Sequence, residues 1–265
     1  MTTHDVGEAR DGSLAVDGVL FDVDDTLVDT ARAFGAALEA ACAYSLPSAG
    51  PDELAAITLH WRADTGGHYG RYTRGELSFH EQRLLRANEV QKRWGGQPLD
   101  DAGYLAWSGR FDAAFMDAWE LLADVPDMLD ALEQAGVRLG VLTNAATEMQ
   151  TRKLTRVGLI ARVPLLVAVD TLGVGKPDVR VFLEACRRLG TDPSRTAYVG
   201  DELTVDALGA VAAGLRGIWV DRPGSRRHLI DETDIVAARA AGVEVLAGLD
   251  GLPAALGLSG GVSRR

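Results

Sequence analysis

The chain of 265 residues carries 27 basic and 38 acidic side chains, which gives a formal net charge of −11 at pH 7. This acidic balance disfavours nucleic acid as a partner, because such a surface repels phosphate backbones. With 47% hydrophobic residues the chain can bury a core without disulfides, so Cys42 and Cys186 are expected to be reduced, buried thiols.

The two ends of the sequence are polar, and residues 1–14 and 259–265 are predicted to be disordered tails. No segment reaches the roughly 20 apolar residues that a membrane-spanning helix needs. The N-terminus also lacks the basic start and apolar stretch of a secretory signal. We therefore expect a cytoplasmic protein without a membrane partner.

The first predicted element is a buried strand at Val16–Val23 that ends in the acidic loop Asp24-Asp25-Thr26. From residue 30 to 118 the sequence is rich in Ala, Leu, Glu and Arg at helical spacing. Proline and glycine residues divide this block into four predicted helices. These helices are Ala31–Tyr44, Pro51–Arg62, Gly75–Arg93 and Asp101–Ala118.

Strands and helices alternate after this block. The predicted strands are Val137–Leu142, Pro164–Val169, Thr196–Val199, Gly217–Val220 and Val243–Leu246. The predicted helices are Val125–Gln134, Thr147–Val157 with Thr147 as N-cap, Asp178–Leu189, Thr204–Ala213 and Leu249–Leu256. This alternation predicts an α/β fold with a Rossmann-like parallel sheet, made of residues 15–29 and 119–258, into which the all-helical block 30–118 is inserted.

Polar residues follow several of the predicted strands at the point where each strand ends. Ligands of such sheets bind at the carboxyl ends of the strands. Four loops from separate parts of the chain are therefore expected to converge at one edge. They carry Asp22 with Asp24, Thr143 with Asn144, Lys176, and Asp201.

Asp22 and Asp24 have the residue types and spacing for phosphoryl transfer. Asp22 could attack phosphorus to form an aspartyl-phosphate, while Asp24 serves as general acid and then general base. This division of roles needs Asp22 ionised and Asp24 protonated at the start, and neighbouring carboxylates push their pKa values apart.

The equatorial oxygens of a phosphoryl group need hydrogen-bond donors and positive charge. Candidate groups are the Thr143 hydroxyl, the backbone N–H of Asn144 and the ammonium of Lys176. Carboxylates around an anionic phosphate also require a metal ion. Asp22, Asp201 and a backbone carbonyl near Asp24 offer the hard oxygen ligands that Mg²⁺ takes.

The four motifs resemble those of the haloacid dehalogenase-like (HAD) superfamily. Its D-x-D-x-T motif matches Asp22, Asp24 and Thr26, and its strand ending in threonine matches Thr143. The Lys-Pro motif matches Lys176-Pro177, and G-D-x-x-x-x-D matches Gly200-Asp201 and Asp206. All four occur in the family's order, between Val16 and about Leu256.

The resemblance implies a role for each matching residue. Asp22 is the nucleophile and Asp24 the general acid/base, while Thr143 and Lys176 bind the phosphoryl group. Mg²⁺ is held by Asp22, the Asp24 carbonyl and Asp201, with Asp206 in support. The inserted helices 30–118 correspond to the cap domain of subfamily I.

Two positions depart from the family's commonest residues. Asp25 stands where glycine is frequent, and aspartate tolerates unusual backbone angles better than most residues. Glu202 stands where serine is frequent. It could add a carboxylate near the metal or cap the following helix.

The insertion offers few residues that could select a substrate. Arg71 and Arg74 could meet a second anionic group, but a solvated loop is the simpler interpretation. The same holds for the arginine-rich segment 222–227. Trp61 and Phe79 have spacings that suit core packing, and His68 and His80 are expected to be surface or packing residues.

The function predicted from these residues is hydrolysis of a small phosphorylated metabolite by a monomer or homodimer. A sugar-phosphate mutase shares all four motifs and remains an alternative. A dehalogenase would not need Asp24 as a general acid. A phosphonate hydrolase would need a lysine in the cap for its chemistry, and the sequence around Lys92 gives no support for such a role. A non-catalytic phosphate-binding protein is a further alternative, although such proteins usually lose Asp22, Asp24 or Lys176.

Overall fold

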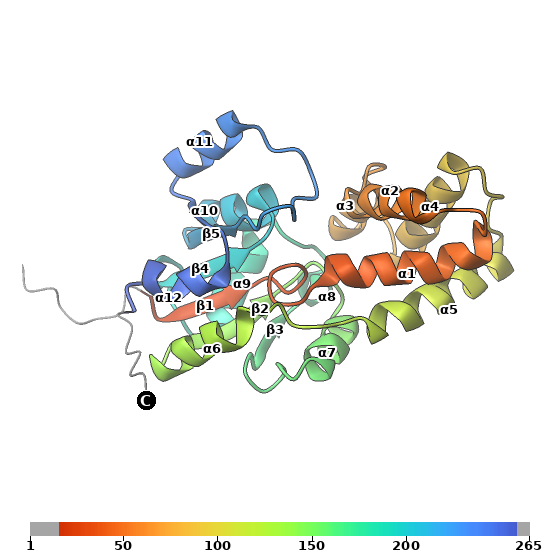
Figure 1. Ribbon diagram of the computed structural model, residues 1–265. Helices are drawn as coiled ribbons and strands as arrows, with labels where there is room; N and C mark the ends of the chain where they lie inside the picture. The colour runs from red at the N-terminus through yellow and green to blue at the C-terminus, as the bar shows by residue number, and fades with distance from the viewer. Residues whose placement is uncertain (1–15, 259–265) are drawn as a thin grey trace, which may run out of the picture.

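A computed structural model of the protein describes residues 16–258. The two predicted tails lie outside these described residues. The core is a six-stranded parallel sheet with the strand order β3-β2-β1-β4-β5-β6 (Figure 1), which confirms the predicted α/β fold. The strands are β1 Gly18–Phe21, β2 Arg138–Leu142, β3 Leu165–Val167, β4 Thr196–Gly200, β5 Arg216–Val220 and β6 Glu244–Leu246.

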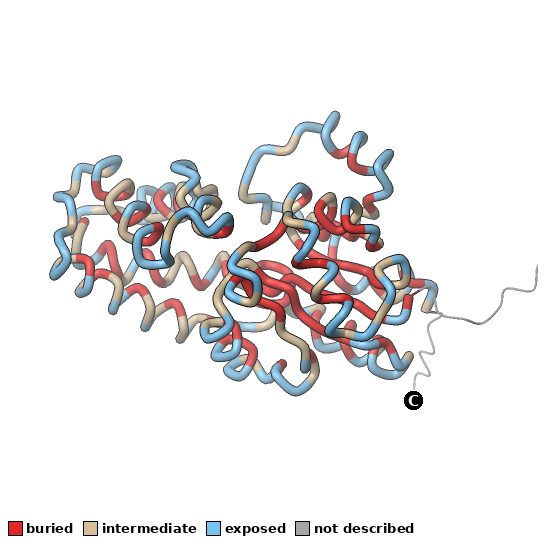
Figure 2. Tube along the Cα trace, turned by 180° about the vertical axis from the view of Figure 1, so that it is seen from behind, coloured by how far each residue is buried: buried red, intermediate tan, exposed pale blue. Residues whose placement is uncertain are grey.

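Helices cover both faces of the sheet, because successive strand residues point to opposite sides. Val19, Phe21 and Val141 pack in one cluster with residues of α6 (Val125–Gln134) and α7 (Thr147–Arg156). Leu20, Leu142 and Tyr198 pack on the other face with α9 (Val179–Leu189) and α10 (Gly209–Ala212). Figure 2 shows the strands as a buried layer between more exposed helices.

The block after β1 is entirely helical, as predicted. It contains α1 Thr30–Ser45, α2 Pro51–Arg62, α3 His68–Thr73, α4 Phe79–Arg93 and α5 Asp101–Asp117. It forms a separate lobe beside the sheet (Figure 1). Rings of Trp61, Trp107, Phe111 and Phe115 pack against each other inside this lobe.

Helix α4 begins at Phe79, four residues later than predicted, and α3 was not predicted. Ser78 caps α4, since its hydroxyl accepts from the N–H of Glu81 while the Glu81 carboxylate accepts from the N–H of Ser78. Gly75 has φ of +76°, a left-handed conformation that interrupts a helix. The capping box therefore decided where this helix starts.

The core helices differ from the predictions in five places. Helix α11 (Glu232–Ala240) was not predicted, and the predicted helix 204–213 is a π-helical turn at Leu203–Leu208 followed by α10. Ala146, not Thr147, is the N-cap of α7, because Thr147 hydrogen-bonds Asp170 instead. The end of the chain has a 3₁₀ turn at Leu249–Gly251, then α12 at Leu252–Ala255, with α8 (Val169–Leu172) as a further short helix.

Both cysteines are buried and free, as predicted. Within residues 16–258, no helix combines the length and the apolar character needed to cross a bilayer.

Gly217 on β5 leaves room for the helical turn that carries Asp206. A Cβ at this position would lie 2.2 Å from the carbonyl oxygen of Ala207. Gly217→Ala is therefore expected to lower the free energy of unfolding by about 1–3 kcal/mol in urea denaturation. Gly35→Ala in α1, where a Cβ meets nothing within 4 Å, is the control and should be neutral or stabilising by up to about 1 kcal/mol. Equal stability of the two variants would contradict this packing argument.

Candidate active site

The four predicted loops meet at the carboxyl edge of the sheet. Lys176 donates to Asp22 Oδ1 at 2.7 Å and to Asp206 Oδ1 at 2.7 Å. Carboxylate oxygens of Asp22, Asp201 and Asp206 lie within 4.8 Å of one another. Thr143 joins the same group through Gln150, which donates to Thr143 and to Asp24. Residues far apart in the sequence thus form one cluster, as the strand-end pattern predicted.

Lys176 is buried at the centre of this cluster. Its ammonium also donates to the hydroxyl of Tyr198 at 2.6 Å, and that hydroxyl donates to the carbonyl of Leu142. Burial by itself lowers the pKa of Lys176, but the carboxylates of Asp206 and Asp22 outweigh burial and raise the pKa well above its usual value. The lysine is therefore a fixed positive charge beneath Asp22.

Asp22 follows directly on β1 and is buried, with its N–H bonded to the carbonyl of Val199. Burial raises the pKa of Asp22 to about 7, against the attraction of Lys176 and with the repulsion of Asp206 and Asp24. In the absence of a metal ion, the negative charge on this carboxylate is therefore costly.

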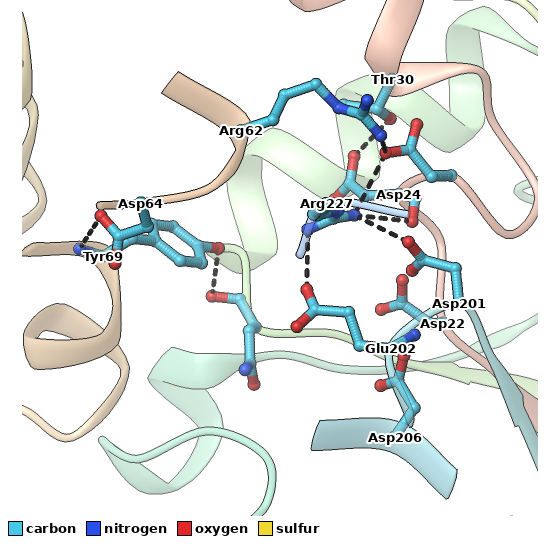
Figure 3. Close-up of polar contacts among 12 residues, drawn as sticks. Asp22, Asp24, Thr30, Arg62, Asp64, Tyr69, Asp201, Glu202, Asp206 and Arg227 are labelled. Carbon is cyan, nitrogen blue, oxygen red and sulfur yellow. Dashed lines mark hydrogen bonds and ion pairs between the residues drawn. The ribbon is translucent and has the colours of Figure 1, made fainter. Parts of the chain in front are cut away.

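Asp24 lies in a different environment from Asp22. Its carboxylate accepts from Thr30 at 2.6 Å (Figure 3 shows Asp24 and Thr30), from Gln150 at 2.7 Å and from the ammonium of Lys153. Burial raises the pKa of Asp24, but Lys153 outweighs burial and lowers the pKa to about 2. We expected Asp22 ionised and Asp24 protonated; the pKa order in the metal-free protein is the reverse, because Lys153 pairs with Asp24.

The oxygen atoms at this edge fit a divalent cation. Asp201 Oδ1 is buried and has no hydrogen-bond partner among the described residues. Burial raises the pKa of Asp201 well above its usual value, even against the attraction of Arg227. A buried carboxylate oxygen without a donor, beside two further carboxylates, is the hard donor set that Mg²⁺ takes.

Arg227 reaches into the same group of oxygens, which corrects the expectation that segment 222–227 is only a solvated loop. Its guanidinium lies 3.3 Å from Asp201 Oδ2 and 3.3 Å from the Asp24 carbonyl oxygen, and it donates to Glu202 at 2.8 Å (Figure 3). Glu202 makes no side-chain capping hydrogen bond. Of its two predicted roles, helix capping is therefore not observed.

Asp25 adopts the left-handed conformation that its sequence position suggested, with φ of +62°. Its carboxylate accepts from the N–H of Ala31 at 2.6 Å and from Arg62 at 2.9 Å. Arg62 also donates to the carbonyl of Ser225. Asp25 thus connects the acidic loop to α1 and α2 of the helical lobe.

Asn144 and Asp206 both hold neighbouring loops in place. The Asn144 side chain donates to the Lys176 carbonyl at 2.9 Å and accepts from the Lys176 N–H at 2.6 Å. Asp206 accepts from the N–H of Glu202 as well as from Lys176. The side chain of Asn144 is therefore engaged, which leaves its backbone N–H as the group named for phosphate binding.

Three residues at the site were missed in the sequence: Gln150, Lys153 and Tyr198. Gln150 and Lys153 are three residues apart on α7, so both lie on the helix face toward Asp24. Lys153 is also one of only three lysines in the chain, with Lys92 and Lys176. That spacing could have revealed both residues, whereas nothing in the sequence marks Tyr198.

The helical lobe contacts the core through other residues than those considered in the sequence. Arg71 and Arg74 are exposed and pair with Glu76, as a solvated loop would. Tyr69 instead donates to the carbonyl of Asn144 at 3.0 Å (Figure 3). Phe79 is 43% exposed, so its predicted place in the core is wrong; its ring packs against Tyr72 at the lobe surface.

Known proteins that are similar in sequence to this chain are hydrolases and phosphatases. The family model for haloacid dehalogenase-like hydrolases matches residues 16–214. A phosphoglycolate phosphatase of Caulobacter vibrioides is 31% identical over 83% of this chain and 81% of its own length. A glyceraldehyde 3-phosphate phosphatase of Methanothermobacter thermautotrophicus is 29% identical over 77% of this chain and 84% of its own.

Solved structures show the same fold. The putative HAD-hydrolase YfnB from Bacillus subtilis, bound to magnesium, superposes with a TM-score of 0.73 at 21% identity, over 91% of this chain and 99% of that one. The chain belongs to the haloacid dehalogenase-like hydrolase family, which confirms the resemblance carried by the four motifs.

The buried charge of Asp22 makes a pH-dependent prediction for the metal-free protein. Since its folded-state pKa is near 7 and lies above the ordinary 3.8, the folded state retains a proton that the unfolded state loses. Stability therefore falls as pH rises from about 4 through 7. Asp22→Asn does not titrate, so in EDTA its stability relative to wild type should be greater at pH 8 than at pH 5, by on the order of 2 kcal/mol.

Urea denaturation at the two pH values measures this difference. Glu39→Gln on the exposed side of α1 is the control and should show the same offset from wild type at both pH values. An offset for Asp22→Asn that is equal at pH 5 and pH 8 would contradict the raised pKa.

Proposed function

We propose that the protein is a cytoplasmic, Mg²⁺-dependent phosphatase that hydrolyses a small phosphorylated metabolite through an aspartyl-phosphate on Asp22. The observation that carries this proposal is the Lys176 ammonium, 2.7 Å from Asp22 and from Asp206, in a cluster whose oxygens also include Asp201. Relatives named as phosphatases, across most of their length, support the same reaction class.

In the first half of the reaction, a carboxylate oxygen of Asp22 attacks phosphorus. The bond between phosphorus and the ester oxygen breaks, and the leaving oxygen takes a proton from Asp24. Because Asp24 has a pKa of about 2 in the free protein, this step requires the negative charge of the bound phosphate to favour the protonated form of Asp24. In the second half, a water attacks phosphorus and gives a proton to Asp24. The acyl-phosphate bond then breaks, which releases phosphate and restores the Asp22 carboxylate.

The remaining residues hold charge and geometry during these steps. In this proposal Lys176 compensates charge on Asp22 and on the phosphoryl oxygens, and the Thr143 hydroxyl and the Asn144 N–H serve as donors to those oxygens. Mg²⁺, held by Asp22, the Asp24 carbonyl and Asp201, neutralises phosphoryl charge when bound. Asp206 orders the loop, since it binds both Lys176 and the N–H of Glu202.

Residues 30–118 act in this proposal as a cap of the subfamily I kind over a core formed by residues 15–29 and 119–258. The hydrogen bond from Tyr69 to Asn144 and the ion pair of Arg62 with Asp25 support this role, because both join the helical lobe to the reacting edge. A cap held over the reacting edge excludes water from it and contacts the organic part of the substrate, so the cap can select the substrate.

Hydrolysis of p-nitrophenyl phosphate tests the proposed function. Wild type should release phosphate with Mg²⁺ and lose this activity in EDTA, and Asp22→Asn should lose about 10³-fold or more in kcat, because the nucleophile is removed. Acid quenching during turnover, then borohydride reduction and peptide mass analysis, should detect homoserine at position 22, the product of a reduced aspartyl-phosphate.

The control variant is Asp127→Asn at an exposed position of α6, which should retain full activity. Release of phosphate at the same rate by Asp22→Asn would overturn the proposal. Isomerisation of a sugar phosphate that a bisphosphate stimulates, without accumulation of free phosphate, would favour the mutase instead. Phosphate binding without any turnover would favour a binding protein.

Lys153 provides a test of the role of Asp24. Lys153→Met removes the main cause of the lowered pKa of Asp24, so a larger share of this acid is protonated at neutral pH. The alkaline limb of kcat for butyl phosphate, whose leaving group needs a proton, should move up by about one pH unit. The profile for p-nitrophenyl phosphate, with a good leaving group, should not move, and neither profile should move in Lys92→Met. A shift that is identical for both substrates would argue against Asp24 as the general acid.

A further inference from the structure

A cavity of about 120 Å³ lies between the reacting edge and the helical lobe. Asp24, Ala145 and Lys153 line it from the core, and α2, α3 and α4 contribute residues from the lobe. Asp24 lines the cavity, whereas Asp22, two residues earlier in the chain, does not. The organic part of a phosphate ester bound at Asp22 would extend into this space.

The charge of this cavity is opposite to that of the protein as a whole. Five basic side chains line it, namely Arg62, Arg83, Arg86, Lys153 and Arg227, against two carboxylates, Asp24 and Asp64. The whole chain carries a formal net charge of −11. A positive, concave surface in an acidic protein concentrates anions.

Three of these cations have partners at the reacting edge. Lys153 pairs with Asp24, Arg62 with Asp25, and Arg227 with Asp201 and Glu202. Their charges are thus compensated by the acidic loops. The other two cations, Arg83 and Arg86, lie on α4 and have their carboxylate partners, Asp112 and Asp64, within the helical lobe.

Arg86 has the weakest compensation of the five. Its guanidinium donates to the carbonyl of Trp61 and, at 3.5 Å, to the side-chain oxygen of Gln82, and it stacks over the Trp61 ring at 4.0 Å. Its nearest carboxylate, Asp64, is 3.7 Å from Nε and already accepts from the N–H groups of Tyr69 and Gly70. Arg86 Nε is buried without a hydrogen-bond partner among the described residues.

Burial, together with nearby Arg83 and Arg227, lowers the pKa of Arg86 to about 10, although Asp64 opposes the change. A guanidinium that is 9% exposed and lacks a bonded carboxylate is costly to bury. An anion entering the cavity would remove this cost.

Arg83 lies three residues before Arg86 and faces the same cavity. One of its terminal nitrogens donates to Asp112 at 2.9 Å, and its Nε is buried without a hydrogen-bond partner among residues 16–258. The ring of Phe111 stacks on its guanidinium at 4.2 Å. Two fixed guanidinium groups on one wall of a cavity can hold a carboxylate or a phosphate.

We propose that Arg86 and Arg83 form a subsite for a second anionic group of the substrate, a carboxylate or a second phosphate. This inference rests on the proposed phosphatase function and makes the substrate a phosphate ester of a small organic acid, or a bisphosphate. The linking part is short and tolerates apolar groups, since Phe34, Trp61 and Phe115 also line the cavity. For comparison, a cavity of about 150 Å³ accepts a benzene ring.

Matched substrate pairs test the subsite. The pairs are 4-(phosphonooxy)butanoate with butyl phosphate and 4-(phosphonooxy)benzoate with phenyl phosphate, and butane-1,4-diyl bisphosphate tests phosphate as the second anion. Wild type should prefer a doubly anionic member over its parent by about tenfold or more in kcat/KM. Arg86→Met should abolish this preference through a higher KM, and Arg86→Lys should restore part of it.

Arg74→Met, which changes an exposed arginine of the same lobe, is the matched control and should keep the preference. Far-ultraviolet circular dichroism checks that every variant is folded, and Arg74→Met should turn over phenyl phosphate at the wild-type rate. Equal kcat/KM within every pair for wild type, or the same loss in Arg74→Met as in Arg86→Met, would overturn the subsite.

A binding experiment separates failure of the subsite from failure of the proposed function. Calorimetry with phenylphosphonate and 4-carboxyphenylphosphonate needs no turnover. Tighter binding of the carboxylated compound to wild type, but not to Arg86→Met, supports the subsite even if no ester is hydrolysed. Equal affinity of wild type for both phosphonates counts against it even if phenyl phosphate is hydrolysed.

Discussion

The buried ammonium of Lys176 is the interaction on which the reacting edge depends. It bonds carboxylates that leave the sheet from different segments, Asp22 after β1 and Asp206 in the turn after β4. Without this positive charge, two buried carboxylates would repel each other at close range. The Asn144 side chain fixes both backbone groups of Lys176, so the position of the ammonium follows from β2 as well.

One lysine still leaves the edge with excess negative charge, and two features of the structure reflect this excess. Asp22 has a raised pKa, and Asp201 keeps a buried oxygen without a donor. Arg227 supplies a cation from a loop that the sheet pattern alone does not place there. The proposed Mg²⁺ requires oxygens of Asp22 and Asp201 and the carbonyl of Asp24, and Arg227 lies beside Asp201 and this carbonyl. The arginine and the metal ion would therefore contact the same groups.

Charge also connects the helical lobe to the core. Asp25, held at positive φ, accepts from Arg62 of α2, while Asp24 accepts from Thr30 at the start of α1. Both aspartates belong to the loop that carries Asp22. The position of the lobe is thus coupled to the loop that carries the proposed nucleophile, and the cavity with Arg83 and Arg86 lies between the two.

The sequence by itself determined the parallel sheet, the helical insertion and the grouping of Asp22, Thr143, Lys176 and Asp201. These follow from local periodicity and from the rule that parallel strands end at one edge. Only the tertiary structure decided that Lys153 pairs with Asp24, that Arg227 reaches Asp201, and that Arg86 lacks a bonded carboxylate. Such pairings depend on how separate elements pack in space. The sequence does not distinguish a buried arginine from a surface arginine, because one residue has no periodic pattern that would indicate its burial.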